Sequence, residues 1–302
     1  MLFRSKNLIE GYYEDRYLKP IAANTNGIFE CLKKGAEYIH WDEKRKKYAK
    51  QTGAVRRGVG MALFSYKTGV WPISLEIAGA RLSLNQDGSV QLQLGATEIG
   101  QGADTVFSQM VAETLQTDMA HVHIQTVQDT DVSPFDTGAY ASRQSFVTGT
   151  AVKHCAEILR DKILAYAKTL LPEVDTRELS LHDNWIWAGE EQAISLAALA
   201  EESYYSLTNS SVLTAEVSEQ VKKNTIATGC CFAEVEVDIK LGKIKILHII
   251  NVHDSGKLLN PQLAEMQVHG GMSMGMGYGI SEQLILDRSE ERRVGKECRS
   301  RW

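Results

Sequence analysis

The residues best suited to chemistry form three junctions rich in glycine or polar side chains. The first is Ile99-Gly100-Gln101-Gly102, which follows a predicted strand and precedes a predicted helix. A turn of this kind aims backbone N–H groups and a helix N-terminus at one point, which suits phosphate or another anion. It is not a dinucleotide fingerprint, because Thr105 stands where the third glycine belongs. The residues alone leave two interpretations open, an anion site and a simple strand-to-helix turn.

The second junction spans residues 136–145 and leads into a predicted helix. Small residues such as Ala141 let a ligand approach the backbone closely. Ser142 and Gln144 offer hydrogen bonds, and Arg143 is able to pair with phosphate. The alternative is an ordinary polar loop with Arg143 in solvent.

The third junction, residues 260–277, is a predicted helix with Asn260 as N-cap and Pro261 at its first position. Its small residues permit close packing against a cofactor or another helix. Its methionines are typical of a hydrophobic core rather than of a ligand set. Gln267 is the polar exception in the middle of the helix.

Other polar groups favour plainer interpretations. His121 and His123 share one strand face, and solvent exposure explains them better than a metal does. Glu234, Glu236 and Asp238 alternate with apolar residues, as on the solvated face of an amphipathic strand. The chain has neither a nucleophile elbow nor a phosphate-binding P-loop motif. We therefore predict no metal-ligating and no catalytic side chain.

Periodicity predicts the elements that must position these junctions. Alternating Ile73, Leu75 and Ile77 indicate a strand, and a hairpin is predicted after it at 79–96. The remaining expected elements, in chain order, are helices within the first 50 residues, a helix over 106–115, a strand at 121–127, a helix over 149–171, a small hairpin around 184–187, a short helix from Ser195, and a hairpin from 233 to 249.

Hairpin, polar loop and helix thus occur twice, near 79–116 and near 230–275. Such a repeat of topology predicts an α+β architecture built from antiparallel hairpins and helices. We expect the two loop–helix junctions to converge on one ligand.

Composition narrows the class of protein further. The 302 residues are 43 % hydrophobic and 24 % charged, which excludes general disorder. A net charge of −5 argues against nucleic acid as partner, and no apolar run reaches the ~18 residues of a membrane span. Five cysteines without a C-x-x-C pair fit a cytoplasmic protein.

Three segments together resemble the molybdenum hydroxylase family, and within it the xanthine dehydrogenase branch most closely. The resemblance runs in order from about residue 8 to residue 286. The segments that carry it are GATEIGQGADTVFSQMVAETL, DTDVSPFDTGAYASRQSFVTGTAV and INVHDSGKLLNPQLAEMQVHGGMSMGMGYG.

The resemblance implies that the chain is the second molybdopterin-binding domain of a longer large subunit. Molybdenum would be held by the pterin, in its cytosine dinucleotide form, and by no side chain of this chain. The cofactor-binding residues that the resemblance implies are Ile99, Gly100, Gln101, Gly102, Ala141, Ser142, Arg143, Gln144 and Gln267.

The implied domain organisation divides the chain into three parts. Residues 1–55 would be the helical end of a preceding domain, and 56–286 the cofactor-binding domain. That domain would hold related halves at 56–171 and 225–286, with an insert at 172–224. Residues 287–302 fit neither pattern and resemble a non-native tail.

The implied activity is hydroxylation of an electron-poor carbon of a purine, hypoxanthine or xanthine. Electrons would pass to 2Fe-2S and FAD centres on partner subunits. An aldehyde or another N-heterocycle is the alternative substrate, and a non-catalytic cofactor-binding module is a further alternative. The family's general base lies in a Gly-x-Gly-Glu-like motif that this sequence lacks, so we expect the chain by itself to be inactive.

Overall fold

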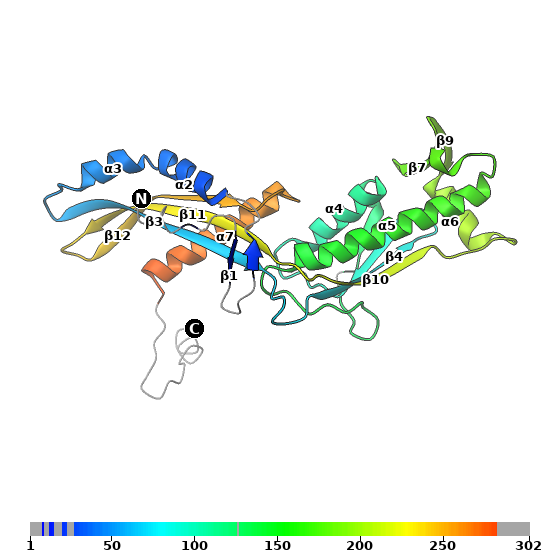
Figure 1. Ribbon diagram of the computed structural model, residues 1–302, viewed down its shortest axis with the longest axis horizontal. Coiled ribbons are helices and arrows are strands. Elements are labelled where there is room, and N and C mark those ends of the chain that lie inside the picture. The colour runs from blue at the N-terminus through cyan, green and yellow to red at the C-terminus, as the bar shows by residue number, and fades with distance from the viewer. Residues whose placement is uncertain (1–7, 9–11, 15–19, 23–26, 126, 283–302) are drawn as a thin grey trace. The chain divides into compact units, whose positions relative to one another are not determined.

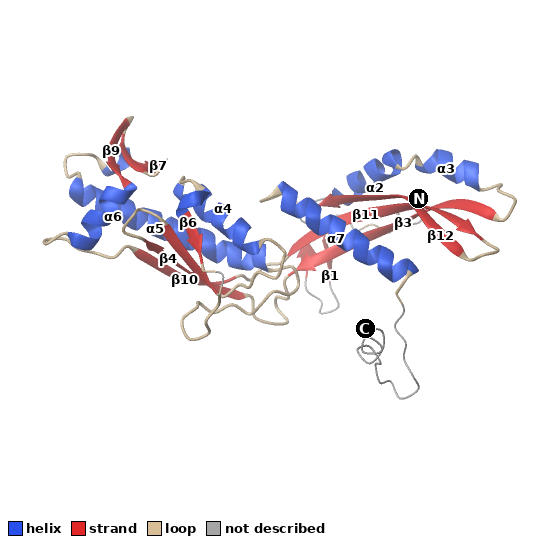
Figure 2. Ribbon diagram, turned by 180° about the vertical axis from the view of Figure 1, so that it is seen from behind, coloured by secondary structure: helices blue, strands red, loops and turns tan. Residues whose placement is uncertain are grey.

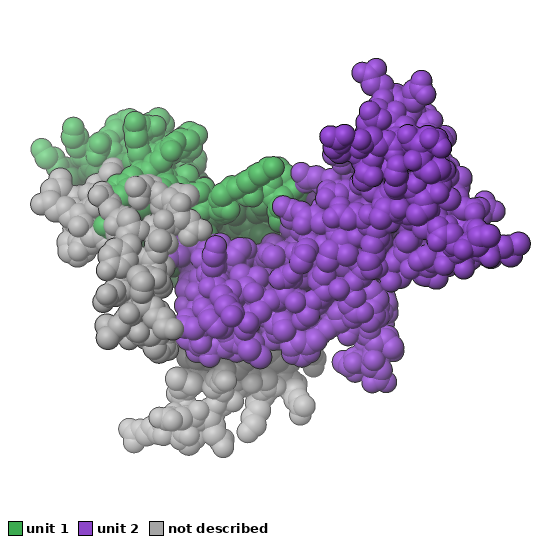
Figure 3. Space-filling model, turned by 45° about the vertical axis from the view of Figure 1, so that its right-hand side comes forward, with its two compact units in different colours: residues 1–65, 227–302 green, residues 66–226 purple. Residues whose placement is uncertain are grey.

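A computed structural model describes residue 8 and residues 12–14, 20–22, 27–125 and 127–282. The chain forms two compact units (Figure 3). One comprises residues 1–65 and 227–302, and the other, inserted between them in sequence, comprises residues 66–226. The predicted domain boundaries stay a prediction, and the predicted tail lies outside the described residues.

The inserted unit is built on a four-stranded sheet in the order β10-β4-β5-β6. Its pairs are antiparallel except β5 with β6, which α4 connects as a parallel crossover. Helices α4 and α5 pack together, and α5 lies along β4 and β10 (Figures 1 and 2). The bounds are β4 Ile77–Leu84, β5 Val90–Leu94, α4 Ala103–Leu115, β6 Val122–Ile124, α5 Gln144–Leu170 and β10 Thr214–Gln220.

Alternation of apolar residues explains this sheet, as predicted for the hairpin. Leu82 on β4 faces Leu92 on β5, and both side chains are completely buried. On the helix side, Leu159 and Ile163 of α5 fill the same core. Burying one such leucine contributes roughly 1.5–3 kcal/mol, so this face fixes the hairpin register.

A second, three-stranded sheet of the inserted unit has the order β7-β8-β9. The predicted small hairpin and the predicted helix from Ser195 are both confirmed, since the Ser195 hydroxyl accepts the Ala198 N–H as an N-cap. The bounds are η1 Met119–His121, η2 Thr176–Glu178, β7 Leu179–His182, β8 Trp185–Ala188, β9 Glu191–Ser195 and α6 Leu196–Tyr205.

The other unit holds a three-stranded sheet in the order β12-β11-β3, with α2 packed against β12. Trp41 meets Phe232 edge-on at 5.6 Å between ring centroids in its core. The bounds are α2 Gly27–Tyr38, α3 Trp41–Tyr48, β3 Val55–Thr68, β11 Thr225–Asp238, β12 Lys243–Asp254 and α7 Pro261–Ile280. The last residues of β3 and the first of β11 are assigned to the inserted unit.

Two predicted elements are wrong. At residues 12–14 and 20–22 the structure has strands where a helix was predicted, because β1 Tyr12–Glu14 pairs antiparallel with β2 Pro20–Ala22. The rest of the predicted helix before residue 27 lies outside the described residues, apart from residue 8. Ile73 and Leu75 lie exposed in a loop, although their alternation predicted a strand. The stretch from 70 to 76 is instead held as turns by loop hydrogen bonds to Val70 and Glu76.

Two side-chain interpretations are also wrong. Glu234 is only 3 % exposed, because Lys44 and Tyr48 of α3 contact its carboxylate at 2.7 and 2.5 Å. A buried carboxylate requires such partners. The methionines of α7 are not core residues in this structure, since none of the residues of that helix is buried.

The predicted α+β class is confirmed. The order hairpin, loop, helix recurs as β4-β5-α4 and as β11-β12-α7. Because the two copies belong to different units, their convergence on one ligand stays a prediction. Among the described helices, none is long and apolar enough to cross a membrane.

Candidate functional site

The glycine-rich loop joins β5 to α4, as predicted. Gly100 and Gly102 both have a left-handed backbone, with φ of 99° and 83°. Glycine adopts this conformation without a steric penalty. No atom lies within 4 Å of the position where a side chain of Gly100 would begin, so the loop surface is open there.

The carboxylate of Glu98 occupies the N-terminus of α4. Its Oε1 accepts the N–H groups of Gly100 and Gly102 at 2.7 and 3.0 Å, and its Oε2 accepts that of Asp104 at 3.1 Å. Burial raises the pKa of Glu98, but these N–H bonds outweigh burial and lower it. The Glu98 carboxylate therefore occupies the helix N-terminus at which the sequence had suggested that an external anion could bind.

Gln101 and Gln144 bring the first two junctions together. The Gln101 amide Nε2 donates to Gln144 Oε1 at 2.6 Å and to the Thr97 carbonyl at 3.0 Å. The Gln144 Nε2 donates to the same carbonyl at 3.2 Å. Ile99 adds its N–H to Gln101 Oε1, and its own side chain is 70 % exposed. The two loops thus form one continuous polar surface.

The second junction turns sharply before α5. Ala141 and Ser142 are both left-handed, with φ of 47° and 50°, which costs roughly 1–3 kcal/mol for each residue that carries a side chain. The Ala141 carbonyl accepts the Gly69 N–H at 2.9 Å. Helix α5 therefore begins at Gln144, five residues earlier than predicted. Ser142 is exposed at the end of the helix.

Arg143 is completely buried, so its predicted alternative as a solvent-exposed side chain is wrong. Its Nε donates to Glu76 Oε2 and its Nη1 to Asp136 Oδ1, both at 2.6 Å. Burial lowers the pKa of Arg143, but the two carboxylates outweigh burial and raise it. The guanidinium is thus paired with two carboxylates inside the protein.

Sequence reasoning missed Glu76 and gave Asp136 no role. Glu76 precedes β4 and lies 67 positions from Arg143, so no periodic pattern connects the two. A weaker signal was present in the second junction, where Asp136 and Arg143 are seven residues apart in a loop of small residues.

Gln267 lies on α7 in the other unit, and its side chain is exposed. The helix begins as predicted, because the Asn260 side chain accepts the Leu263 N–H at 3.0 Å and Pro261 follows it. His121 and His123 are exposed, as expected. Within the described part of the chain, no group of three or more His, Cys, Asp or Glu residues is arranged to hold a metal ion.

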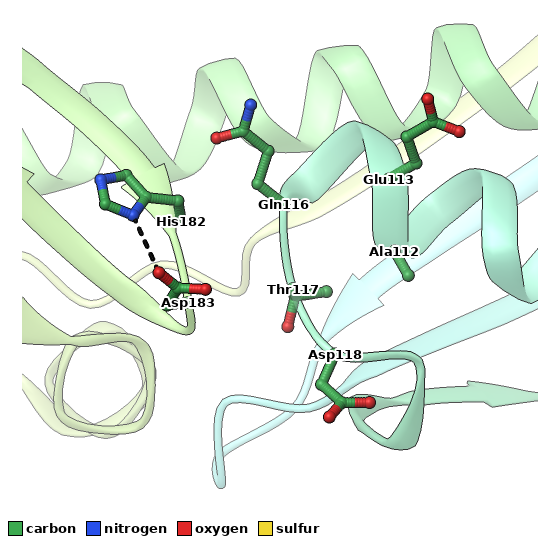
Figure 4. Close-up of a pocket in the computed structure, with 7 residues that line it drawn as sticks. All are labelled: Ala112, Glu113, Gln116, Thr117, Asp118, His182 and Asp183. Atoms are coloured by element: carbon green, nitrogen blue, oxygen red, sulfur yellow. Dashed lines mark hydrogen bonds and ion pairs between the residues drawn. The ribbon is translucent and has the colours of Figure 1, made fainter.

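A separate open cavity of about 580 Å³ lies where the end of α4 meets the β7–β8 turn (Figure 4). His182 stacks on Trp187 with 4.4 Å between ring centroids, and its Nδ1 lies 3.2 Å from the Asp183 carboxylate. None of the predicted site residues lines it. The lining residues are Ala112, Glu113, Gln116, Thr117, Asp118, His182 and Asp183.

The sequence is similar to known proteins over most of its length. The sequence model of the molybdopterin cofactor-binding domain matches residues 34–296. A xanthine dehydrogenase molybdenum-binding subunit from Escherichia coli O157:H7 is 48 % identical over 264 residues, which cover 86 % of this chain and 35 % of the relative. A protein of E. coli K12 named probable hypoxanthine oxidase is 31 % identical, over 89 % of this chain and 27 % of its own.

A solved structure agrees with the fold. Quinoline 2-oxidoreductase from Pseudomonas putida 86 superposes with a TM-score of 0.80 at 20 % identity, over 93 % of this chain and 37 % of that one. The chain spans about a third of the length of the curated relatives it matches. Since the family match extends over most of the sequence, the chain belongs to the molybdopterin cofactor-binding domain family.

Proposed function

We propose that the loops at 99–102 and 141–144, together with Gln267, bind a molybdopterin cofactor. The observation that carries the proposal is the free N-terminus of α5. The N–H groups of Ser142, Gln144 and Ser145 make no hydrogen bond within the described residues. Unbonded N–H groups after a left-handed turn suit an anion, and the dipole of a long helix strengthens such a site. The phosphates of the cofactor would bind here.

Two further features fit the organic part of the cofactor. Asp104 Oδ1 is buried without a hydrogen-bond partner, and the N–H groups of a pterin are donors of the kind it lacks. Burial raises the pKa of Asp104, and the nearby Glu98 carboxylate raises it further. The open surface over Gly100 gives a flat ring room to approach the backbone. The residues present therefore fit the group.

When bound, the cofactor supplies the oxidative chemistry, with its metal held by the pterin. The chain's own residues bind and orient it. The N–H groups at the start of α5 would hold the phosphates, which we propose belong to a cytosine dinucleotide. The Gln101–Gln144 amide pair would face the pterin. The Ser142 hydroxyl has no hydrogen-bond partner among the described residues and would donate to the ligand.

For the whole protein we propose hydroxylation of a purine, hypoxanthine or xanthine, in the cytoplasm. Iron–sulfur and FAD-binding partners would carry the electrons away. The names of the relatives and their order of identity, 48 % and then 31 %, support a purine. The chain alone would not turn over substrate, because the motif that holds the family's general base is not in this sequence.

The test is purification of the full-length protein that contains this chain. We expect bound molybdenum and pterin, release of a cytosine nucleotide on acid hydrolysis, and oxidation of hypoxanthine or xanthine. Oxidation of aldehydes or other heterocycles alone would favour the alternative substrates, and bound pterin without any turnover would favour a non-catalytic module. A folded protein without pterin would refute cofactor binding. The Ser142→Ala variant should retain less pterin than Ser145→Ala, because Ser145 would contribute only its N–H.

A further inference from the structure

We infer that Glu76 and Asp136 are positioning residues for the cofactor loop. They hold the guanidinium of Arg143, and Arg143 in turn holds the Ala141–Ser142 turn in the conformation that exposes its N–H groups. The inference rests on the proposed function in one respect only, the ligand that the turn receives. It assigns Arg143 itself an indirect role, through the loop, rather than a contact with phosphate.

Burial makes this ion cluster inaccessible to a ligand. The side chains of Arg143, Glu76 and Asp136 are completely buried. A buried guanidinium left without a carboxylate would be strongly unfavourable. A ligand phosphate could reach Arg143 only by displacing an internal carboxylate. The guanidinium therefore serves the protein's own structure.

The loop is wrapped around this guanidinium. Arg143 Nη1 also donates to the Gly138 carbonyl at 3.0 Å, and its Nη2 donates to the Ile77 carbonyl at 2.8 Å. The Tyr140 ring lies over the guanidinium with its centroid 5.5 Å from Cζ. The Arg143 N–H donates to the Tyr140 carbonyl at 3.1 Å. Gly138 and Tyr140 thus share the Arg143 guanidinium as a partner.

Each carboxylate bridges two segments. Glu76 Oε1 accepts the Val70 N–H at 2.5 Å, and the adjacent Gly69 N–H holds the Ala141 carbonyl. Glu76 therefore links Arg143 to residues 69–70, and Gly69 in turn holds the strained Ala141–Ser142 turn. Because each carboxylate oxygen has a different partner, loss of one charge should loosen the turn more than the surrounding core.

Asp136 joins the same ion cluster to α5. Its Oδ2 accepts the Thr148 hydroxyl at 2.7 Å, and its Oδ1 accepts the Gly138 N–H at 2.8 Å in addition to Arg143. The loop beside it is fixed on β4, where the Gly79 N–H donates to the Phe135 carbonyl at 2.7 Å. Asp136 therefore sets the distance between the loop and the helix end.

The test compares E76Q and D136N with E216Q in the full-length protein. Glu216 pairs with Arg81 in the same unit, but its side chain is 56 % exposed, so E216Q matches the chemical change without touching the loop. For E76Q and D136N we expect exchange of the Gly69 and Arg143 amides, which donate to the Ala141 and Tyr140 carbonyls, to accelerate about tenfold. Exchange in the α5 core should stay as in the wild type. Pterin dissociation should accelerate by a similar factor, and E216Q should change neither.

Wild-type exchange of the Gly69 and Arg143 amides and wild-type pterin dissociation in both variants would overturn the inference. If the wild-type protein binds no pterin, the proposed function fails, while the exchange measurement still decides the positioning role. If E76Q and D136N do not fold, T148V takes their place, since it removes one hydrogen bond to Asp136 and no charge. About twofold faster exchange in T148V would support the inference, and unchanged exchange would refute it.

Discussion

Replacing Glu98 by alanine should destabilise the inserted unit measurably. The carboxylate satisfies three backbone N–H groups at the start of α4, at 2.7 to 3.1 Å. Loss of an ordinary N-cap costs about 0.5–2 kcal/mol, and this cap has three bonds instead of one. Glu98 is partly exposed, and water would replace part of what is lost. We therefore expect E98A to lower the free energy of unfolding by about 1–2 kcal/mol.

The effect should depend on pH in a defined direction. The folded protein lowers the pKa of Glu98, so the stabilisation is fully present above the unfolded pKa, about 4.3. It is lost as the pH falls through the folded pKa, because protonation removes the anion from the helix N-terminus. The difference between wild type and E98A should therefore be constant at neutral pH and shrink below about pH 4.

Thermal unfolding measured between pH 3.5 and 7 tests both statements. A change of 1–2 kcal/mol corresponds to a melting temperature about 2–8 °C lower for a unit of this size. E113A is the matched control, because Glu113 is exposed near the C-terminus of the same helix and should be close to neutral. A wild-type melting temperature for E98A at pH 7 would refute the reasoning, as would a difference that persists undiminished at pH 3.5.

Three further predictions follow from buried groups elsewhere. K44M should destabilise its unit by about 2 kcal/mol in urea unfolding, because it leaves the Glu234 carboxylate buried without Lys44. R57M, which removes the exposed partner of Glu236, should unfold like the wild type. G95A should perturb the amide signals of Phe135 and Asp136, because an added side chain would overlap the Pro134 carbonyl, and wild-type signals would contradict this. Cys155 is completely buried, and burial raises its pKa to about 11. Alkylation at pH 8, followed by peptide mapping, should therefore be at least about 100-fold slower in the native chain than in urea.

Local sequence signals predicted the elements that depend on local physics. The 79–96 hairpin follows from alternation and a turn, and both of its strands face one buried core. The starts of α6 and α7 follow from Ser195 and Asn260, whose side chains bond N–H groups three residues later. In each case the interacting groups lie close together in sequence, so their spacing carries the information.

Long-range charge pairs could not be predicted in this way. Glu234 has the alternation of a solvated strand face, but its partner Lys44 lies 190 positions away. For Arg143 the sequence suggested phosphate or solvent as partner, but in the structure its guanidinium pairs with Glu76. A charged residue reads as exposed until its counter-charge is located, and that counter-charge is fixed by the tertiary fold.

The same principle governs both cofactor loops of the inserted unit. At the first loop Glu98 neutralises the helix N-terminus, and at the second Glu76 and Asp136 neutralise the single cation. Apart from the Asp104 carboxylate on α4, the groups left available are uncharged, namely the N–H groups before α5, the Ser142 hydroxyl and the amide pair. Under the proposed function, recognition would then depend on directed dipoles in a preorganised turn rather than on surface charge. Fixed dipoles select a ligand by geometry, which is why the internal carboxylates that hold the turn matter as much as the groups that face the ligand.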